Sequence, residues 1–165
     1  MRKVLSVLVD NEPGVLSRVV GLFSGRGFNI ESLCVAPTVD SSKSKIVITT
    51  SGNEQVLEQI QKQLNKLVNV IKVVDYQNKD FVEREMIMVK VQAKSDSRAE
   101  ILRIADIFRA RVVDVSAHSY SLALTGDKDK LNGFIEILSP HGITDIVRTG
   151  TIIMERDMRG RRKHS

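Results

Sequence analysis

The chain has 165 residues, 42% of them hydrophobic, a composition that is typical of a globular protein and argues against disorder. No window approaches the ~20 uncharged apolar residues that a membrane-spanning helix needs, and the N-terminus does not resemble a signal peptide. The net charge is +5, but the last eleven residues hold five cations against two acids. We therefore expect a soluble, cytoplasmic protein with a basic tail, and its one cysteine suits a reducing compartment.

The first half of the chain predicts six elements in the order βαββαβ. Strands are indicated by alternation of Val and Leu with polar residues, and helices by apolar residues at every third or fourth position. The elements expected in chain order are strand 2–9, helix 14–25, strand 28–36, strand 45–51, a helix capped by Asn53, and strand 70–76. The polar stretch 77–80 that follows has no periodicity and is predicted to be a linker.

The second half repeats this order. Ser97 and Glu100 have the spacing of a capping box, which predicts the start of a helix. The expected elements are strand 85–93, a helix from Ser97, strands 111–116 and 119–125, a helix carrying Leu131, Phe134 and Leu138, and a closing strand 144–154.

We therefore predict an α+β fold of two consecutive ferredoxin-like domains, 1–77 and 82–155, followed by the basic tail 156–165. Each domain is near the lower size limit for a stable core, so oligomerisation is expected. The uncharged segment 32–36 supports this, because the second strand of such a sheet lies at an edge that another chain would have to cover.

The turn between the first strand and the first helix carries the most chemical information. Asn11 can cap the helix, Pro13 fits its first turn, and Gly14 lets another molecule approach the backbone. Unpaired N–H groups at Gly14, Val15 and Leu16, at the positive end of the helix dipole, would suit an anion such as a carboxylate. The same spacing also fits an ordinary capped turn.

This turn opens a longer pattern that resembles a known family. The pattern comprises residues 10–18 (DNEPGVLSR), Leu22-Phe23, residues 26–33 (RGFNIESL) and residues 35–38 (VAPT). It is similar to the start of the small regulatory subunit of acetolactate synthase, and the similarity continues over nearly the whole chain except the tail. The resemblance implies an N-terminal ACT domain, a second domain of related topology, and no catalytic activity.

The resemblance also implies an effector site between two ACT domains that pair side by side as a homodimer. The effector would be an end product of branched-chain amino-acid synthesis, typically valine. The residues that correspond to the site are Asn11, Gly14, Val15, Leu16, Asn29 and Ile30. The ligand carboxylate would meet the backbone at 14–16, and the opposing chain would supply Asn29, whose amide oxygen can accept from the ligand ammonium. The branched side chain would contact Val15, Leu16 and Ile30.

The partner implied by the resemblance is the large catalytic subunit of acetolactate synthase. Thiamine diphosphate, magnesium and FAD would belong to that subunit, and this chain would bind none of them. The corresponding turn of the second half, 94–98, has no Pro-Gly pair, so we expect no second effector site there. The second half is instead expected to act on the catalytic subunit.

No catalytic or metal site is predicted. The histidines, His118, His141 and His164, lack the spacing of helical metal ligands, and Cys34 within an apolar strand is expected to be a buried, inert thiol. An RRM-like RNA-binding module shares the βαββαβ order, but it needs aromatic residues on its sheet, and aromatic residues make up 4% of this chain. A free-standing amino-acid-binding protein without an enzyme partner remains an alternative.

Overall fold

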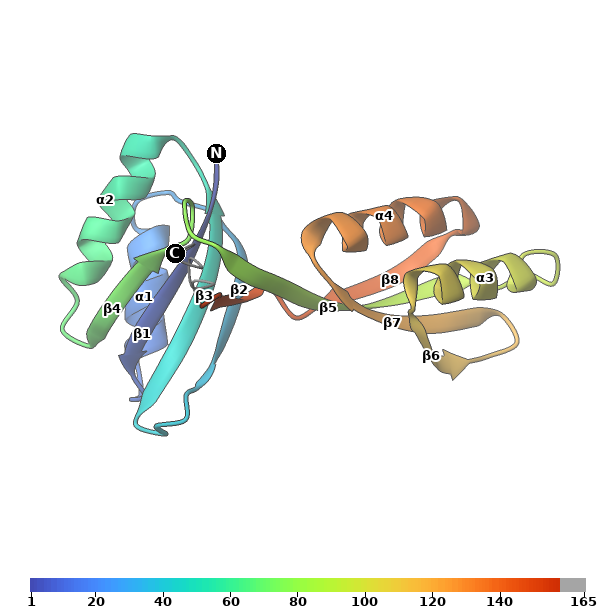
Figure 1. Cartoon of the computed structure of the whole chain (residues 1–165), viewed down its shortest axis with the longest axis horizontal. Helices are drawn as coiled ribbons and strands as arrows, with labels where there is room; N and C mark the ends of the chain where they lie inside the picture. Colours follow the sequence, from blue (N-terminus) through green and yellow to red (C-terminus); the bar gives the residue numbers. More distant parts are fainter. Residues whose placement is uncertain (158–165) are drawn as a thin grey trace, which may run out of the picture. The chain divides into compact units, whose positions relative to one another are not determined.

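The computed structural model describes residues 1–157, which divide into two units (Figure 1). Unit 1 comprises Met1–Val82 together with the described residues from Ile153, and unit 2 comprises Glu83–Ile152. The element order and the antiparallel sheets confirm two ferredoxin-like folds. Within residues 1–157, no helix is long and apolar enough to cross a membrane. Most of the predicted basic tail, including His164, lies outside the described residues.

Unit 1 is built on a four-stranded sheet in the order β2-β3-β1-β4. Its elements are β1 (Arg2–Asp10), α1 (Val15–Ser24), β2 (Ile30–Pro37), β3 (Lys43–Ser51), α2 (Glu54–Asn65) and β4 (Val70–Asp75). The predicted edge position of the second strand is confirmed. Asn53 caps α2 as predicted, because its side chain accepts a hydrogen bond of 2.9 Å from the Val56 N–H.

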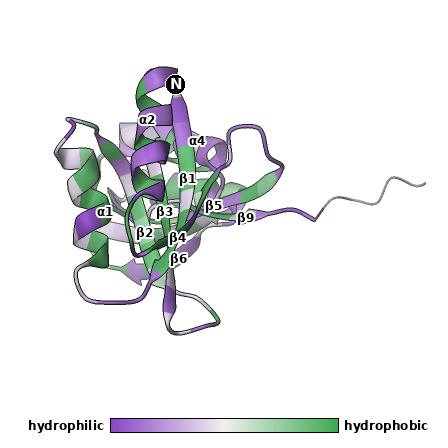
Figure 2. Cartoon of the chain, turned by 90° about the vertical axis from the view of Figure 1, so that its left-hand side faces the viewer, coloured by the Kyte–Doolittle hydropathy of each residue, from purple (hydrophilic) through white to green (hydrophobic). Residues whose placement is uncertain are grey.

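The core of unit 1 lies between the two helices and one face of this sheet. Alternate residues of β1 point to that face, where Leu5, Val7 and Val9 pack with Phe23 of α1 and Leu57 of α2. Figure 2 shows that α1 and α2 each carry both hydrophobic and hydrophilic stretches, as amphipathic helices do. Burial of these apolar stripes fixes both helices on the same side of the sheet.

The opposite face of the first sheet is covered in part by the end of the chain. There Ile153 packs in a buried cluster with Val4, Val47 and Tyr76. The predicted closing strand 144–154 is therefore wrong as a single element: it is two strands, β8 (Ile143–Arg148) and β9 (Ile152–Glu155). Between them Gly150 has a φ of +84°, a left-handed conformation that redirects the chain.

The end of the chain groups differently in the two compact units than in the predicted domains 1–77 and 82–155: β9 pairs with β5 (Phe81–Gln92), yet nearly all of β9 belongs to unit 1. Ion pairs hold this end of the chain, with Arg156 3.4 Å from Asp80 and Lys79 3.8 Å from Glu155. The predicted linker 77–80 therefore contacts the end of the chain.

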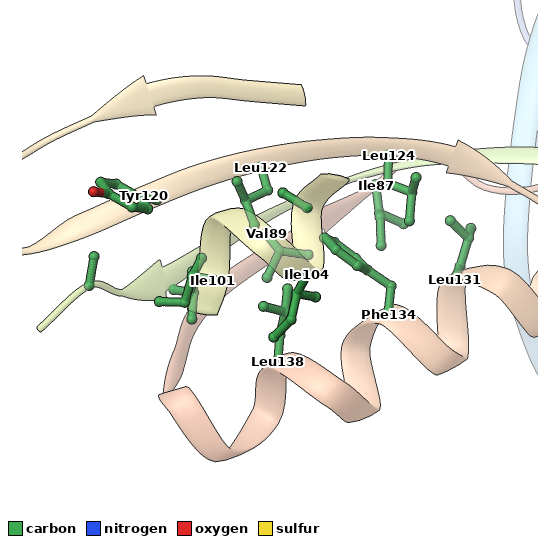
Figure 3. Packing of buried hydrophobic residues seen from close by; sticks show 13 residues of the cluster. Ile87, Val89, Ile101, Ile104, Tyr120, Leu122, Leu124, Leu131, Phe134 and Leu138 are labelled. Atoms are coloured by element: carbon green, nitrogen blue, oxygen red, sulfur yellow. The ribbon is translucent and has the colours of Figure 1, made fainter. Parts of the chain in front are cut away.

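Unit 2 has a sheet in the order β6-β7-β5-β8, with β9 paired to β5 off this path. Its other elements are α3 (Arg98–Phe108), β6 (Arg111–Val115), β7 (Ser119–Gly126), α4 (Lys128–Leu138) and a short 3-10 helix (Ser139–His141) before β8. Figure 3 shows the separate core of this unit, in which Phe134 of α4 points toward Ile87 and Leu124 on the strands.

The predicted capping box at the start of α3 is wrong. The Ser97 side chain makes no capping hydrogen bond within the described structure. Its hydroxyl instead donates to the Lys94 carbonyl at 3.2 Å. A serine hydroxyl can bond to a local carbonyl as readily as it caps a helix, so the spacing alone was not decisive.

Candidate functional site

The start of α1 is open. Gly14 precedes the helix with a φ of +85°, and no side chain caps this end among residues 1–157. In the same range, the N–H groups of Gly14, Leu16 and Ser17 have no hydrogen-bond partner. The first helical turn holds no acidic residue, so no carboxylate of α1 itself offsets these N–H groups and the positive end of the helix dipole. This geometry suits a small anion.

One predicted donor is not open. The Val15 N–H donates to the Glu12 carbonyl at 3.4 Å, and the Val15 side chain, 3% exposed, lies in the core of unit 1. The predicted contacts of Val15 with a ligand are therefore corrected. Ser17, which was not predicted, supplies an open N–H instead, and Leu16, 38% exposed, is the accessible apolar side chain beside it.

Asn11 does not cap the helix, contrary to one of its predicted roles. Its side-chain amide donates to the Ser41 carbonyl at 2.9 Å, and its N–H donates to the Ser42 carbonyl at 2.8 Å. Asn11 thereby ties the turn before α1 to the connection between β2 and β3. Hydrogen bonds from the hydroxyl and N–H of Ser42 shape that connection and lower the pKa of the Asp40 carboxyl.

Asn69 holds the same turn from the other side. Its side-chain amide donates to Asp10 at 3.3 Å and to Glu12 at 3.4 Å, and its carbonyl accepts from the Asp10 N–H at 2.9 Å. Its side-chain oxygen accepts from Arg18 of α1. Sequence reasoning missed Asn69, because its partners lie more than fifty residues away.

Within one chain, the remaining predicted site residues lie far from this turn. Asp10 pairs with Lys43 at one end of β3, whereas Ile30 pairs with Thr50 near the other end. Seven residues of strand separate the two positions, about 24 Å at ~3.4 Å per residue. Asn29 is exposed and Ile30 is half-buried. A single chain therefore holds the two halves of the predicted site apart.

The outer edge of β2 can pair with another strand. The Thr38 N–H donates to the Lys43 carbonyl at 2.8 Å, which sets the alternation of the antiparallel ladder. By that alternation, the N–H and C=O groups of Leu33 and Val35 point away from β3. Cys34 on this strand is half-buried, so the prediction of a buried thiol is wrong.

Among residues 1–157, no three or more His, Cys, Asp or Glu side chains gather as metal ligands would. His141 lies 3.9 Å from Glu100, and the buried carboxylate of Glu85 pairs with Arg148. Both contacts lie within unit 2.

Fold and site together define the class of this protein: a regulatory protein built on an ACT domain. A family model described as the AHAS small subunit-like ACT domain matches residues 5–72, and one described as the small subunit of acetolactate synthase matches residues 84–157. The chain belongs to the family of acetolactate synthase small subunits.

Individual relatives agree with this assignment over nearly the whole chain. The acetolactate synthase small subunit of Haemophilus influenzae is 52% identical over 94% of this chain and 96% of its own length. A probable small subunit from Archaeoglobus fulgidus is 46% identical, with 94% and 98% covered. The crystal structure of the small subunit from Thermotoga maritima superposes with a TM-score of 0.84 at 38% identity, covering 95% of this chain and 98% of that one.

Proposed function

We propose that this chain is the regulatory subunit of an acetolactate synthase in branched-chain amino-acid biosynthesis. It activates the catalytic subunit, and valine or a related amino acid withdraws that activation by binding between two paired ACT domains. Family membership supports the regulatory role. The observation that carries the effector site is the uncapped start of α1, where three N–H groups face the surface.

The chemistry of an α-amino acid matches the groups that are available. Its carboxylate fits the N–H groups of Gly14, Leu16 and Ser17, and its ammonium can donate to the amide oxygen of Asn29. A branched side chain would contact Leu16 and Ile30, both of which are at least partly accessible. The ligand thus needs groups from both halves of the site.

A second copy of the chain supplies the missing half. Antiparallel pairing of two β2 edges about a two-fold axis would bring the Ile30 end of one strand beside the Pro37 end of the other. The Pro37 end adjoins the connection that Asn11 holds. A homodimer would therefore contain two effector sites, each shared between the chains.

Calorimetry of the purified chain against valine, leucine and isoleucine tests this proposal. We expect one of the three to bind and to lower the activity of the reconstituted enzyme by several-fold, because regulatory ligands typically contribute ~1–3 kcal/mol of coupling. Binding of none of them would refute the effector site. Co-purification with the catalytic subunit separates this function from that of a free-standing amino-acid-binding protein.

We propose that the catalytic subunit binds thiamine diphosphate, magnesium and FAD, and that this chain binds none of them. We also propose that it works in the cytoplasm and binds neither nucleic acid nor membranes. The titration that measures the effector can include each cofactor, and heat of binding for any of them would contradict this assignment.

Blocking the edge of β2 is expected to abolish effector binding. The N–H that Val35→Pro removes points away from β3, so the hydrogen bonds between β2 and β3 are kept. The outer edge of β2 loses a hydrogen-bond donor, and the proline ring hinders a second strand from pairing there. We expect a monomer by sedimentation velocity and an affinity for valine at least ~10-fold weaker. Val35→Thr, which retains the N–H, should remain dimeric. A dimeric Val35→Pro that binds valine normally would rule out pairing through this edge.

A further inference from the structure

The backbone at Asn29 lies in an irregular stretch of the chain. β2 begins only at Ile30, and the register between β2 and β3 shifts between Ile30 and Ser32. On the N-terminal side, Gly27 has a φ of +70° and the Phe28 N–H closes the end of α1 by donating to the Phe23 carbonyl at 3.0 Å. The regular backbone hydrogen bonds between β2 and β3 therefore do not fix the position of the Asn29 backbone.

A side chain of the neighbouring strand holds this position instead. The hydroxyl of Thr50 on β3 donates to the Asn29 carbonyl at 2.7 Å. Thr50 is 0% exposed, so its hydroxyl is shielded from water that could compete for this bond. The neighbouring residue on the same strand, Ser51, bonds to Glu31 at the register shift.

The surroundings of Thr50 are themselves fixed. Thr50 pairs with Lys3 on β1, and the Lys3 ammonium lies 2.9 Å from the Asp75 carboxylate of β4. The side chains of this ion pair are 5% and 20% exposed. Thr50 thus lies in a strand position whose β1 neighbour, Lys3, is anchored to β4.

We propose that Thr50 is a positioning residue for the effector site: its hydroxyl fixes the Asn29 backbone so that the Asn29 amide reaches the effector ammonium in the opposing chain. This inference rests on the proposed function, because it assigns Thr50 a role only through Asn29. Thr50 itself is buried and does not touch the ligand.

The test compares Thr50→Val, which removes the hydroxyl at nearly constant shape, with Thr50→Ser, which keeps it. Calorimetry with valine should show a five- to tenfold weaker affinity for Thr50→Val, about the worth of one hydrogen bond, and nearly normal affinity for Thr50→Ser. Thr50→Ala removes the hydroxyl in a smaller side chain and serves if the valine variant folds poorly. Urea unfolding and sedimentation velocity should show folded dimers for every variant that is compared.

A double-mutant cycle with Asn29→Ala shows whether Thr50 acts through Asn29. We expect Thr50→Val to weaken binding no further once Asn29 is alanine. Normal affinity of Thr50→Val, equal losses for the serine and valine variants, or additive losses in the cycle would each overturn the role of Thr50 while the effector site stands. If the wild-type chain binds none of the three amino acids, the proposed function fails, and this inference fails with it.

Discussion

Gly14→Asp is expected to abolish the response to valine while the chain still folds, dimerises and activates the catalytic subunit. A Cβ at Gly14 meets no atom within 4 Å, so the added side chain fits. Its carboxylate would lie beside the open N–H groups of α1 and repel the carboxylate of the ligand. At ~5 Å and an effective dielectric constant of ~20, two like charges repel by ~3 kcal/mol, which weakens binding by about 100-fold.

The matched control separates charge from backbone strain. Gly14 has a φ of +85°, and an L-residue pays ~1–2 kcal/mol in that region, asparagine less than most. Gly14→Asn has the shape of aspartate without its charge, so it should bind valine far better than Gly14→Asp. Calorimetry and inhibition curves for both variants show whether charge or backbone strain weakens valine binding. Equal affinity of the two variants would show that charge beside the helix start has no role, and normal feedback in Gly14→Asp would place the site elsewhere.

Most of the fold was predictable because both halves of the sequence show the same βαββαβ order of elements. Alternating apolar residues in β1 and the apolar stripes of α1 and α2 face one core, so local periodicity and packing agree. The split between β8 and β9 was not predictable from that signal. Apolar residues lie on both sides of Gly150, at Ile146, Val147, Ile152 and Ile153, and their periodicity does not show that the chain is redirected at Gly150 between β8 and β9.

The helix start at this turn was predictable from the sequence, but its hydrogen bonds were not. Pro13 and Gly14 predict a helix start at this turn, and within the described range that start has no side-chain cap. Which N–H groups stay free depends on the path of the turn, which Ser41 and Asn69 set from distant parts of the sequence. Sequence spacing reports local geometry, so the tertiary partners of Asn11 could not be read from it.

Phe134→Ala is expected to destabilise unit 2 by ~3–5 kcal/mol and to leave valine binding intact. Phe134 is 0% exposed, and its ring centroid lies 5.3 Å from that of Phe108 within the core of unit 2. A unit of about seventy residues has a free energy of unfolding of only ~4–10 kcal/mol. The substitution therefore leaves unit 2 only marginally stable. The proposed effector site lies in unit 1, whose core contains Phe23 instead.

Phe23→Ala makes the matching change in the core of unit 1. Phe23 is also 0% exposed, and it lies at the opposite end of α1 from the open N–H groups. Calorimetric melting and valine titration of both variants should show opposite patterns: Phe134→Ala binds valine but loses activation of the catalytic subunit, whereas Phe23→Ala loses valine binding. Valine binding that fails in Phe134→Ala would mean that the effector site depends on both cores. If Phe134→Ala still activates the catalytic subunit, the contact with that subunit would have to be assigned to unit 1 instead of unit 2.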